Sequence, residues 1–296
     1  MTWLAALASI PVPEGQRDIW AEWLAVRRFG GNPEERRRML DDLAPVRDKV
    51  LDRSGLAAGE TLLDVGCGEG MIAFGALERG AGHVIFSDIS QDVLDFCRQV
   101  ADERCSFVRA PAEDLTAIPD GSVDVVTTRS VLIYTAEKER AFREFFRVLR
   151  PDGRISLYEP INRFGMEERR QDFWGYPSHG FGELVQRVLH VYEEIQPASD
   201  PMLDFDERDL VALAEAAGFF PIGLELQVEI KAPEPRPWNT FVNHSGNPKI
   251  PTIAEAMDQA LGPEERERLA EHLRPLVERG AGVWRMAHAY LAATKP

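Results

Sequence analysis

The feature that most constrains this chain is a short apolar run that breaks into alternating glycines. Leu62–Val65 has the length of a buried strand and is too short for a helix. Gly66, Gly68 and Gly70 follow at alternate positions, and a helical stretch resumes at Met71. Glycines there let a ligand touch the main chain, and the free N–H groups that begin the helix can receive an anionic group. The run therefore predicts the strand, turn and helix that open a nucleotide-binding α/β unit.

The spacing of the glycines differs from the G-x-G-x-x-G fingerprint of dinucleotide-binding proteins. The third glycine comes one residue early, and Met71 fills the expected place. With Asp64 ahead of them, the residues read Asp-x-Gly-x-Gly-x-Gly, which resembles motif I of the class I S-adenosylmethionine (SAM)-dependent methyltransferases. The resemblance extends along residues 60–160 and more weakly to the C-terminus. It implies SAM as the methyl donor; a plain glycine-rich turn is the alternative interpretation.

From Leu62 onward, short apolar runs alternate with amphipathic segments. This pattern is typical of a parallel sheet with helices on both faces. We expect a doubly wound α/β fold with a seven-stranded, mostly parallel sheet. Its strands are expected at 61–65, 84–87, 106–109, 123–128, 154–159, 221–230 and 283–292. The turn Arg150–Gly153 should separate the amphipathic helix 136–149 from the fifth strand.

Two further regions flank this core. The N-terminal region reads as helices, with Asn32 as a cap for a helix that begins at Pro33. It could cover a sheet edge or close over the active site. About 50 residues between the sixth and seventh strands exceed what a hairpin needs and predict a helical lid or substrate-recognition insertion on the ligand side. The expected division is a cap at 1–55, a core at 56–232 and 283–296, and an insertion at 233–282.

Ligands of a doubly wound sheet bind beyond the carboxyl ends of its strands. Asp88 ends the second strand 22 residues after Gly66, the interval at which an acid binds ribose hydroxyls; a helix N-terminal acid is its alternative role. The resemblance implies adenine contacts from Ala112 and Glu113, although a proline replaces the family's acid before them. Arg129 could bind the cofactor's carboxylate or a substrate anion. The expected cofactor-binding residues are Asp64, Gly66, Cys67, Gly68, Gly70, Asp88, Ile89, Ala112, Glu113 and Arg129.

The candidates on the acceptor side are fewer. Glu159 ends the fifth strand and could act as a base or position the acceptor, or else pair with Arg163 or cap a turn. Tyr134 could form a pocket wall, and the loop residues His179 and His244 could reach the pocket. The insertion carries polar and aromatic residues suited to a small organic substrate, namely Trp238, Asn239, Phe241, Asn243 and His244. The ranked catalytic candidates are Glu159, Tyr134, His179 and His244.

Composition excludes several kinds of partner. The 296 residues carry a formal net charge of −15, which argues against nucleic acid and anionic membranes because phosphate binding depends on basic surface. No run approaches the length of a membrane span, and residues 1–8 lack the basic region of a signal peptide, so a short helix is expected there. Cys67, Cys97 and Cys105 show no metal-ligand spacing. We therefore expect no metal site and a cytoplasmic protein with reduced thiols.

The expected function is methyl transfer from SAM to an O, N or C atom of a small organic molecule by in-line displacement. The enzyme's main contribution would be to orient the acceptor, and a base is needed only for a poor nucleophile. A nicotinamide-dependent oxidoreductase is one alternative, although its fingerprint is broken at Met71 and no Tyr-x-x-x-Lys pair occurs. A non-methylating relative that keeps the cofactor pocket is another. The sequence leaves the oligomeric state open, a homodimer included.

Overall fold

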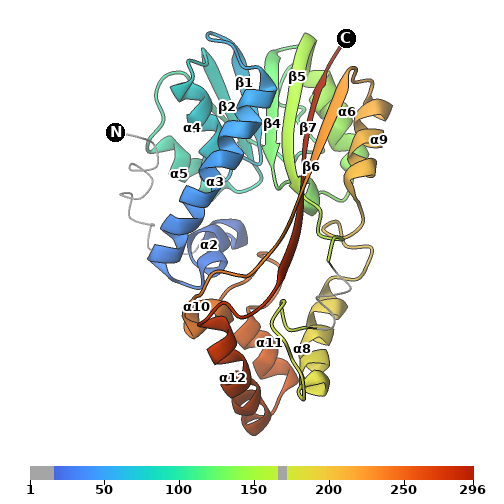
Figure 1. The fold of residues 1–296 in the computed structure, drawn as a ribbon. Helices are drawn as coiled ribbons and strands as arrows, with labels where there is room; N and C mark the ends of the chain where they lie inside the picture. Colours follow the sequence, from blue (N-terminus) through green and yellow to red (C-terminus); the bar gives the residue numbers. More distant parts are fainter. Residues whose placement is uncertain (1–16, 166–171) are drawn as a thin grey trace.

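In the part of the chain that the computed structural model describes, residues 17–165 and 172–296, one seven-stranded sheet forms the centre of the fold. The helix expected at 1–8 lies outside these residues. The strand order is β3-β2-β1-β4-β5-β7-β6, and β7 alone runs in the direction opposite to the other strands (Figure 1). The predicted seven-stranded, mostly parallel sheet is confirmed. The strands are β1 Thr61–Val65, β2 His83–Asp88, β3 Cys105–Arg109, β4 Val123–Arg129, β5 Leu149–Pro160, β6 Ile222–Lys231 and β7 Trp284–Thr294.

Helices cover both faces of this sheet. One face is covered by α3 (Pro33–Ser54), α4 (Met71–Glu78) and α5 (Gln91–Arg98). The other is covered by α6 (Lys138–Val148) and α9 (Glu207–Ala217). Successive side chains of a strand point to opposite faces, so Leu62 and Leu63 of β1 enter different hydrophobic cores, and both are fully buried. The central strands are therefore apolar throughout, as a sheet covered on both faces requires.

The helix ends follow the capping signals in the sequence. The Asn32 side chain accepts hydrogen bonds from the main-chain N–H groups of Glu34 and Glu35, so α3 begins where expected. Asp206 and Asp209 form a capping box at the start of α9, and Gly218 ends that helix in the left-handed conformation. Local chemistry alone fixes these boundaries.

The fifth strand begins earlier than expected. Val123 pairs with Leu149 and Val125 with Arg154, so the residues between them bulge out of the ladder instead of ending it. Asp152 within the bulge has a φ of 63° and donates its main-chain N–H to the carbonyl oxygen of Lys295 at 2.9 Å. The predicted turn is therefore a bulge inside β5, because the C-terminal end of the chain supplies its hydrogen bond.

A helical layer lies beyond the carboxyl edge of the sheet (Figure 1). It consists of α8 (Gly182–Ile195), α10 (Trp238–Val242), α11 (Ile253–Ala260) and α12 (Pro263–Val277). These helices share a third hydrophobic core, in which Tyr176, Val188, Phe241 and Leu273 are buried. The sequence did not predict α10, because its residues stand in a segment rich in proline and asparagine. α8 comes from the β5–β6 connection, yet it packs with the helices of the β6–β7 connection.

The short helices α2 (Ile19–Ala25) and η1 (Arg27–Phe29) lie between the sheet and this helical layer (Figure 1). β1 to β5 are parallel, so their carboxyl ends all meet this space. β6 runs parallel to β5, since both are antiparallel to β7, and the β6–β7 connection therefore emerges on the same side, as predicted. Among the described helices, none is both long and apolar enough to cross a bilayer.

Candidate cofactor and acceptor site

The glycine loop lies at the carboxyl end of β1. Gly66, Gly68 and Gly70 have φ values of 63°, 52° and 80°, a region that side chains disfavour. A Cβ atom would lie 2.3 Å from a neighbouring side-chain atom at Gly66 and 2.5 Å from one at Gly70, so packing forbids a side chain there as well. At Gly68 the nearest atom would be Leu24 Cδ1 at 4.0 Å. The middle glycine is therefore the point at which a ligand can approach the main chain under α2.

Asp88 lies directly beside this loop. One carboxylate oxygen accepts the main-chain N–H of Gly68 at 3.0 Å, and the other accepts that of Ser90 at 2.9 Å. Burial raises the pKa of Asp88, and the two N–H donors act against that rise. Asp88 thus lies at the N-terminal end of a helix and is also hydrogen-bonded to the glycine loop. Of its neighbours, Cys67 is buried and Ile89 is exposed.

Asp64 has a different position. Its side chain is buried; one carboxylate oxygen accepts the Thr127 hydroxyl at 2.9 Å, and the other accepts the main-chain N–H of Ala73 at 3.2 Å. These bonds join β1 to β4 and to the first turn of α4. Burial raises the pKa of Asp64 to about 7. The carboxylate therefore supports the glycine loop from inside the fold.

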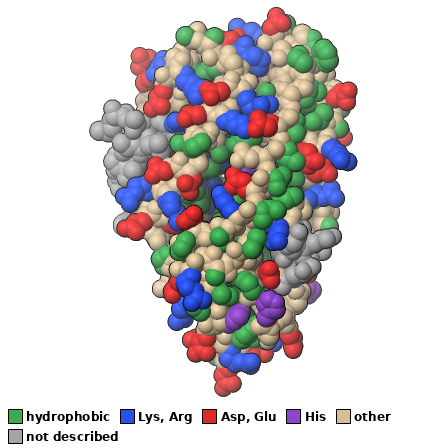
Figure 2. All heavy atoms as spheres, viewed as in Figure 1, with side chains coloured by type: hydrophobic (Ala, Val, Ile, Leu, Met, Phe, Trp, Pro, Cys, Tyr) green, Lys and Arg blue, Asp and Glu red, His purple; other side chains and the backbone are tan. Residues whose placement is uncertain are grey.

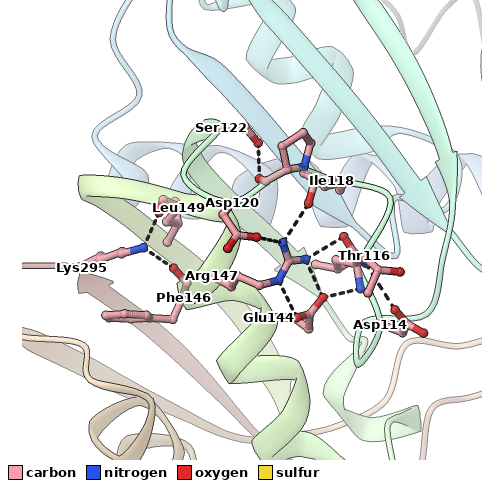
Figure 3. A network of polar contacts seen from close by, with 12 residues as sticks. Asp114, Thr116, Ile118, Asp120, Ser122, Glu144, Phe146, Arg147, Leu149 and Lys295 are labelled. Atoms are coloured by element: carbon pink, nitrogen blue, oxygen red, sulfur yellow. Dashed lines mark hydrogen bonds and ion pairs between the residues drawn. The ribbon is translucent and has the colours of Figure 1, made fainter.

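The segment after β3, which carries Ala112 and Glu113, is fixed by a polar network from α6 (Figure 3). Glu144 accepts the main-chain N–H of Leu115 at 2.7 Å. Arg147 donates to the carbonyl oxygens of Leu115 and Ile118, each at 2.9 Å, and also binds Glu144. Ala112 is buried, and Glu113 is half-buried. The network sets the path of the segment that the sequence assigns to the adenine ring.

Glu159 is completely buried at the end of β5. Its carboxylate accepts three main-chain N–H groups, from Val131, Leu132 and Ile133, at 2.9, 3.0 and 3.4 Å. Burial raises the pKa of Glu159 to about 7 against these three donors. The carboxylate thereby holds the turn that leads into η2 (Leu132–Tyr134). This geometry suits a positioning residue, since the oxygens face the main chain of that turn.

Aromatic rings cover the same turn. The Tyr134 ring meets Trp20 edge-to-face with centroids 5.1 Å apart, and it meets Trp23 at 6.4 Å. Both tryptophans belong to α2. Burial raises the pKa of Tyr134 to about 12, so its hydroxyl stays protonated at neutral pH. Tyr134 therefore forms a wall beneath α2.

Two arginines meet at the end of β4. Arg129 ends the strand, and Arg28 belongs to η1. Burial and the charge of Arg129 together lower the pKa of Arg28 to about 10. The Arg28 guanidinium lies over the rings of Trp23 and Phe29, at 5.1 and 5.8 Å. Within residues 17–165 and 172–296, neither guanidinium has an ion pair or side-chain hydrogen bond. Sequence reasoning missed Arg28, because only the fold brings η1 to β4.

His244 follows α10 in the helical layer and contacts η1. Its Nδ1 lies 2.8 Å from the carbonyl oxygen of Arg28, which can only accept, so Nδ1 carries the proton and Nε2 keeps its lone pair. Burial, together with the nearby charges of Arg236 and Arg28, lowers the pKa of His244 to about 4. The imidazole is therefore neutral at pH 7, with Nε2 as a hydrogen-bond acceptor.

Two cavities meet at His244. The smaller, about 280 Å³, lies against α8 and α11, and it reaches Asn162 just after β5. The larger, about 710 Å³, lies between α3, the β6–β7 hairpin and the helical layer. Figure 2 shows this face of the molecule hollowed near its middle, with acidic and basic side chains around the opening. Both cavities are lined by Trp174, His244, Gly246 and Ile253. His179 is exposed and lines neither of them.

α2 and η1 are fastened to the helical layer and its adjoining loops. The Trp23 indole donates to the carbonyl oxygen of Ser245 at 2.7 Å, and the Ser245 N–H donates to the carbonyl oxygen of Arg27 at 2.9 Å. Arg27 also forms a two-pronged ion pair with Glu255, at 3.0 and 2.8 Å. At the other end of α2, Asp18 accepts the Ser90 hydroxyl at 2.7 Å. α2 and η1 thus connect the glycine-loop side of the site to the His244 side.

Comparison with known proteins agrees with this geometry. Residues 63–157 match the family described as "Methyltransferase domain". The chain is 30% identical over 180 residues to the ubiquinone/menaquinone biosynthesis C-methyltransferase UbiE of Vibrio parahaemolyticus, covering 57% of this chain and 68% of the relative. It is 31% identical over the same length to UbiE of Yersinia pestis, covering 57% of this chain and 70% of the relative.

Two solved structures share the fold. One is a methyltransferase structure from Bacillus halodurans, with a TM-score of 0.51, 19% identity, and coverage of 84% of this chain and 98% of the other. The other is phosphoethanolamine N-methyltransferase 2 of Haemonchus contortus in complex with SAM, with a TM-score of 0.50, 19% identity, and coverage of 93% and 56%. The glycine loop with Asp88 beside it, and the guanidiniums of Arg28 and Arg129, which form no ion pair with the described residues, fit a nucleoside that carries a carboxylate. The chain therefore belongs to the class I SAM-dependent methyltransferases, and it is an enzyme that uses SAM as its methyl donor.

Proposed function

We propose that the chain methylates a small organic acceptor bound in the space that α2 and the helical layer enclose. The observation that carries this proposal is the juxtaposition under one cap of an open Gly68, a hydrogen-bonded Asp88 and a neutral His244 that lines both cavities. When bound, SAM supplies an activated methyl group on a sulfonium sulfur. The residues of this chain bind, orient and shield the two reactants.

The cofactor side is assigned as follows. The main chain at Gly66, Cys67, Gly68 and Gly70 would hold the cofactor closely, and Asp88 would accept its ribose hydroxyls. Asp64 supports this loop through its internal hydrogen bonds. Ile89, Ala112 and Glu113 are assigned to the adenine. Arg129 would bind the carboxylate, and Arg28 supports the same role because two adjacent guanidiniums without a carboxylate partner among the described residues favour an anion.

On the acceptor side, His244 is the candidate proton acceptor, because its free Nε2 belongs to a side chain that lines both cavities. Glu159 is assigned to positioning, through the turn that it holds, and Tyr134 to the wall beneath α2. His179 stays a prediction without a supporting contact. We also propose that α8 leaves the core at 56–232 and 283–296 to join residues 233–282 as the recognition layer, with the cap at 1–55.

The proposed acceptor is a small molecule, for three reasons. The cavities lie against a helical layer, the aromatic side chain of Trp174 lines both of them and that of Tyr192 lines the smaller, and the net charge of −15 disfavours nucleic acid. The two relatives named above are C-methyltransferases of quinone biosynthesis, which keeps carbon among the O, N and C acceptors. A cytoplasmic location accords with the free thiols of Cys67, Cys97 and Cys105.

Calorimetry tests this proposal directly. S-adenosylhomocysteine, the product form of the cofactor, should bind with measurable heat, whereas NADH should give none at the same concentration. Transfer of a labelled methyl group from SAM to a panel of small aromatic and aliphatic acceptors should then identify the acceptor class. Absence of heat with S-adenosylhomocysteine would contradict the assigned cofactor site. Tight cofactor binding without turnover on any acceptor would favour the non-methylating alternative.

A further inference from the structure

Arg236, in the connection between β6 and α10, is nearly buried and poorly satisfied. Its side chain is 11% exposed, and within residues 17–165 and 172–296 its guanidinium makes no hydrogen bond. Its Nε atom is buried without a partner. A guanidinium has five N–H donors, and a buried charge without acceptors is costly. This arginine therefore needs an explanation beyond its packing.

The neighbouring carboxylate of Glu35 does not satisfy the Arg236 guanidinium. Glu35 Oε1 lies 3.7 Å from Arg236, beyond hydrogen-bond distance, but 2.8 Å from Arg38. Two guanidiniums thus share one carboxylate, and the closer of them is Arg38. The hydroxyl of the fully buried Tyr176, which lies near Arg236, also lacks a partner among the described residues. The group as a whole has more donors than acceptors.

The surrounding residues hold Arg236 in position before any ligand binds. Pro235 and Pro237 flank it and restrict the main chain on both sides. Its guanidinium lies over the Trp284 ring at 4.8 Å, an arrangement that orients the planar fork. The loop that carries it is packed so closely against Gly280 that a Cβ there would lie 2.3 Å from the Pro233 carbonyl oxygen. Such pre-organisation favours recognition of a ligand with two oxygens in a plane.

Arg236 lines the larger cavity, and so does His244. The charge of Arg236 also acts on His244, in keeping with the cavity that they share. The rest of the lining combines apolar side chains with charged side chains of both signs; its apolar members include Met39, Trp174, Phe241, Trp284 and Met286. A molecule that presents its reactive group to His244 can therefore place an acidic group on Arg236 and bury an apolar body between them.

We propose that Arg236 binds an acidic oxygen group of the methyl acceptor, so that the acceptor is an organic acid with an apolar body. This inference rests on the proposed function, because it takes the cavity at His244 as the acceptor site. Arg236 would act as a specificity residue that binds substrate and takes no part in bond making. A two-pronged guanidinium–carboxylate pair in a buried site is among the strongest recognition contacts that proteins form.

Matched probes test the proposal. The protein, saturated with S-adenosylhomocysteine, is titrated by calorimetry with 3-phenylpropionate, 3-phenylpropan-1-ol and 3-phenylpropylamine, which share one aromatic body and differ in the terminal group. We expect the carboxylate to bind at least about tenfold more tightly than the alcohol, the amount that a charged hydrogen bond supports. Arg236→Gln should abolish this preference while leaving the affinity for the alcohol unchanged, and Arg236→Lys should restore part of it.

Lys231→Gln is the matched control, because Lys231 lines the same cavity, carries the same charge and is already paired with Glu229 at 2.6 Å. It should keep the preference for the carboxylate. The proposal is overturned if wild type binds the alcohol or amine as tightly as the carboxylate, if the carboxylate does not bind, or if Arg236→Gln keeps the preference. Binding of S-adenosylhomocysteine alone to each variant separates this result from failure of the proposed function, and thermal unfolding shows whether the variant is folded.

Discussion

Asp88 has a structural role in the fold and a proposed role in binding the cofactor. Its carboxylate receives N–H groups from the glycine loop and from the start of the next helix, and it also lies where a ribose is expected. Asp88→Ala should weaken binding of S-adenosylhomocysteine by about tenfold to a hundredfold, the range for loss of a hydrogen bond to a charged group. Calorimetry on the variant measures this change.

The control for this substitution is Asp95→Ala on the same helix. Asp95 is exposed and paired with Arg98. It should bind S-adenosylhomocysteine like wild type. An unchanged affinity in Asp88→Ala would remove Asp88 from the cofactor site.

His244 makes stability depend on pH. Its pKa of about 4 lies below the ordinary 6.5, so the unfolded chain takes up the proton more readily than the folded one between these values. The contribution of neutral His244 is therefore complete above pH 6.5 and is lost as the pH falls toward 4. The difference amounts to about 3 kcal/mol at most. His244→Gln cannot titrate, so its free energy of unfolding should fall less than that of wild type over this range.

Urea unfolding of wild type and His244→Gln at half-unit intervals from pH 7.5 to 4 measures this effect. Other buried groups, among them Asp64 and Glu159, titrate in both proteins and cancel in the comparison. Parallel curves for the two proteins would show that the site does not hold His244 neutral.

At the scale of secondary-structure elements, the decisive feature is the bridge that α2 and η1 form between sheet and helical layer. Trp23 makes this bridge through the bond from its indole to the Ser245 carbonyl oxygen. Trp23→Phe keeps an aromatic ring but leaves that buried oxygen unpaired, at a cost of about 1–3 kcal/mol. We expect the main-chain amides of 19–29 to exchange their hydrogens faster in this variant.

Trp20→Phe provides the comparison. Trp20 lies on the same helix and also contacts Tyr134, but its indole N–H makes no hydrogen bond to the described residues. Hydrogen exchange over 19–29 should stay close to wild type in Trp20→Phe. Equal exchange in both variants would mean that the bond to Ser245 does not hold the cap.

At the scale of the whole molecule, α2 and η1 join the glycine-loop side and the His244 side of the site into one unit. A ligand that binds only the folded protein, at a hundredfold its dissociation constant, stabilises it by about 2.7 kcal/mol. S-adenosylhomocysteine at that excess should therefore raise the midpoint of thermal unfolding by about 5 °C in a chain of this size. Because α2 joins the sheet to the helical layer, the shift should move a single transition. Two transitions, of which one shifts, would show that the layer unfolds independently.

The sequence by itself determined the parts that depend on neighbours along the chain. The glycine loop, Asp88, the strands and the caps at Asn32 and Asp206 are local patterns, because main-chain conformation and hydrogen bonding within a few residues fix them. The family follows from the same local pattern. The opening of the β6–β7 connection on the ligand side follows from the parallel sheet.

Only the tertiary structure decided the rest. The bulge in β5 depends on the C-terminal end of the chain, and the core that α8 shares with α10, α11 and α12 joins segments far apart in sequence. The lone pair on His244 is fixed by a carbonyl oxygen more than 200 residues away. Arg28 and Arg236 become candidate binding residues because they are buried beside groups that their spacing in the sequence does not predict. Burial and charge are sums over neighbours in space, so they become definite only when the chain has folded.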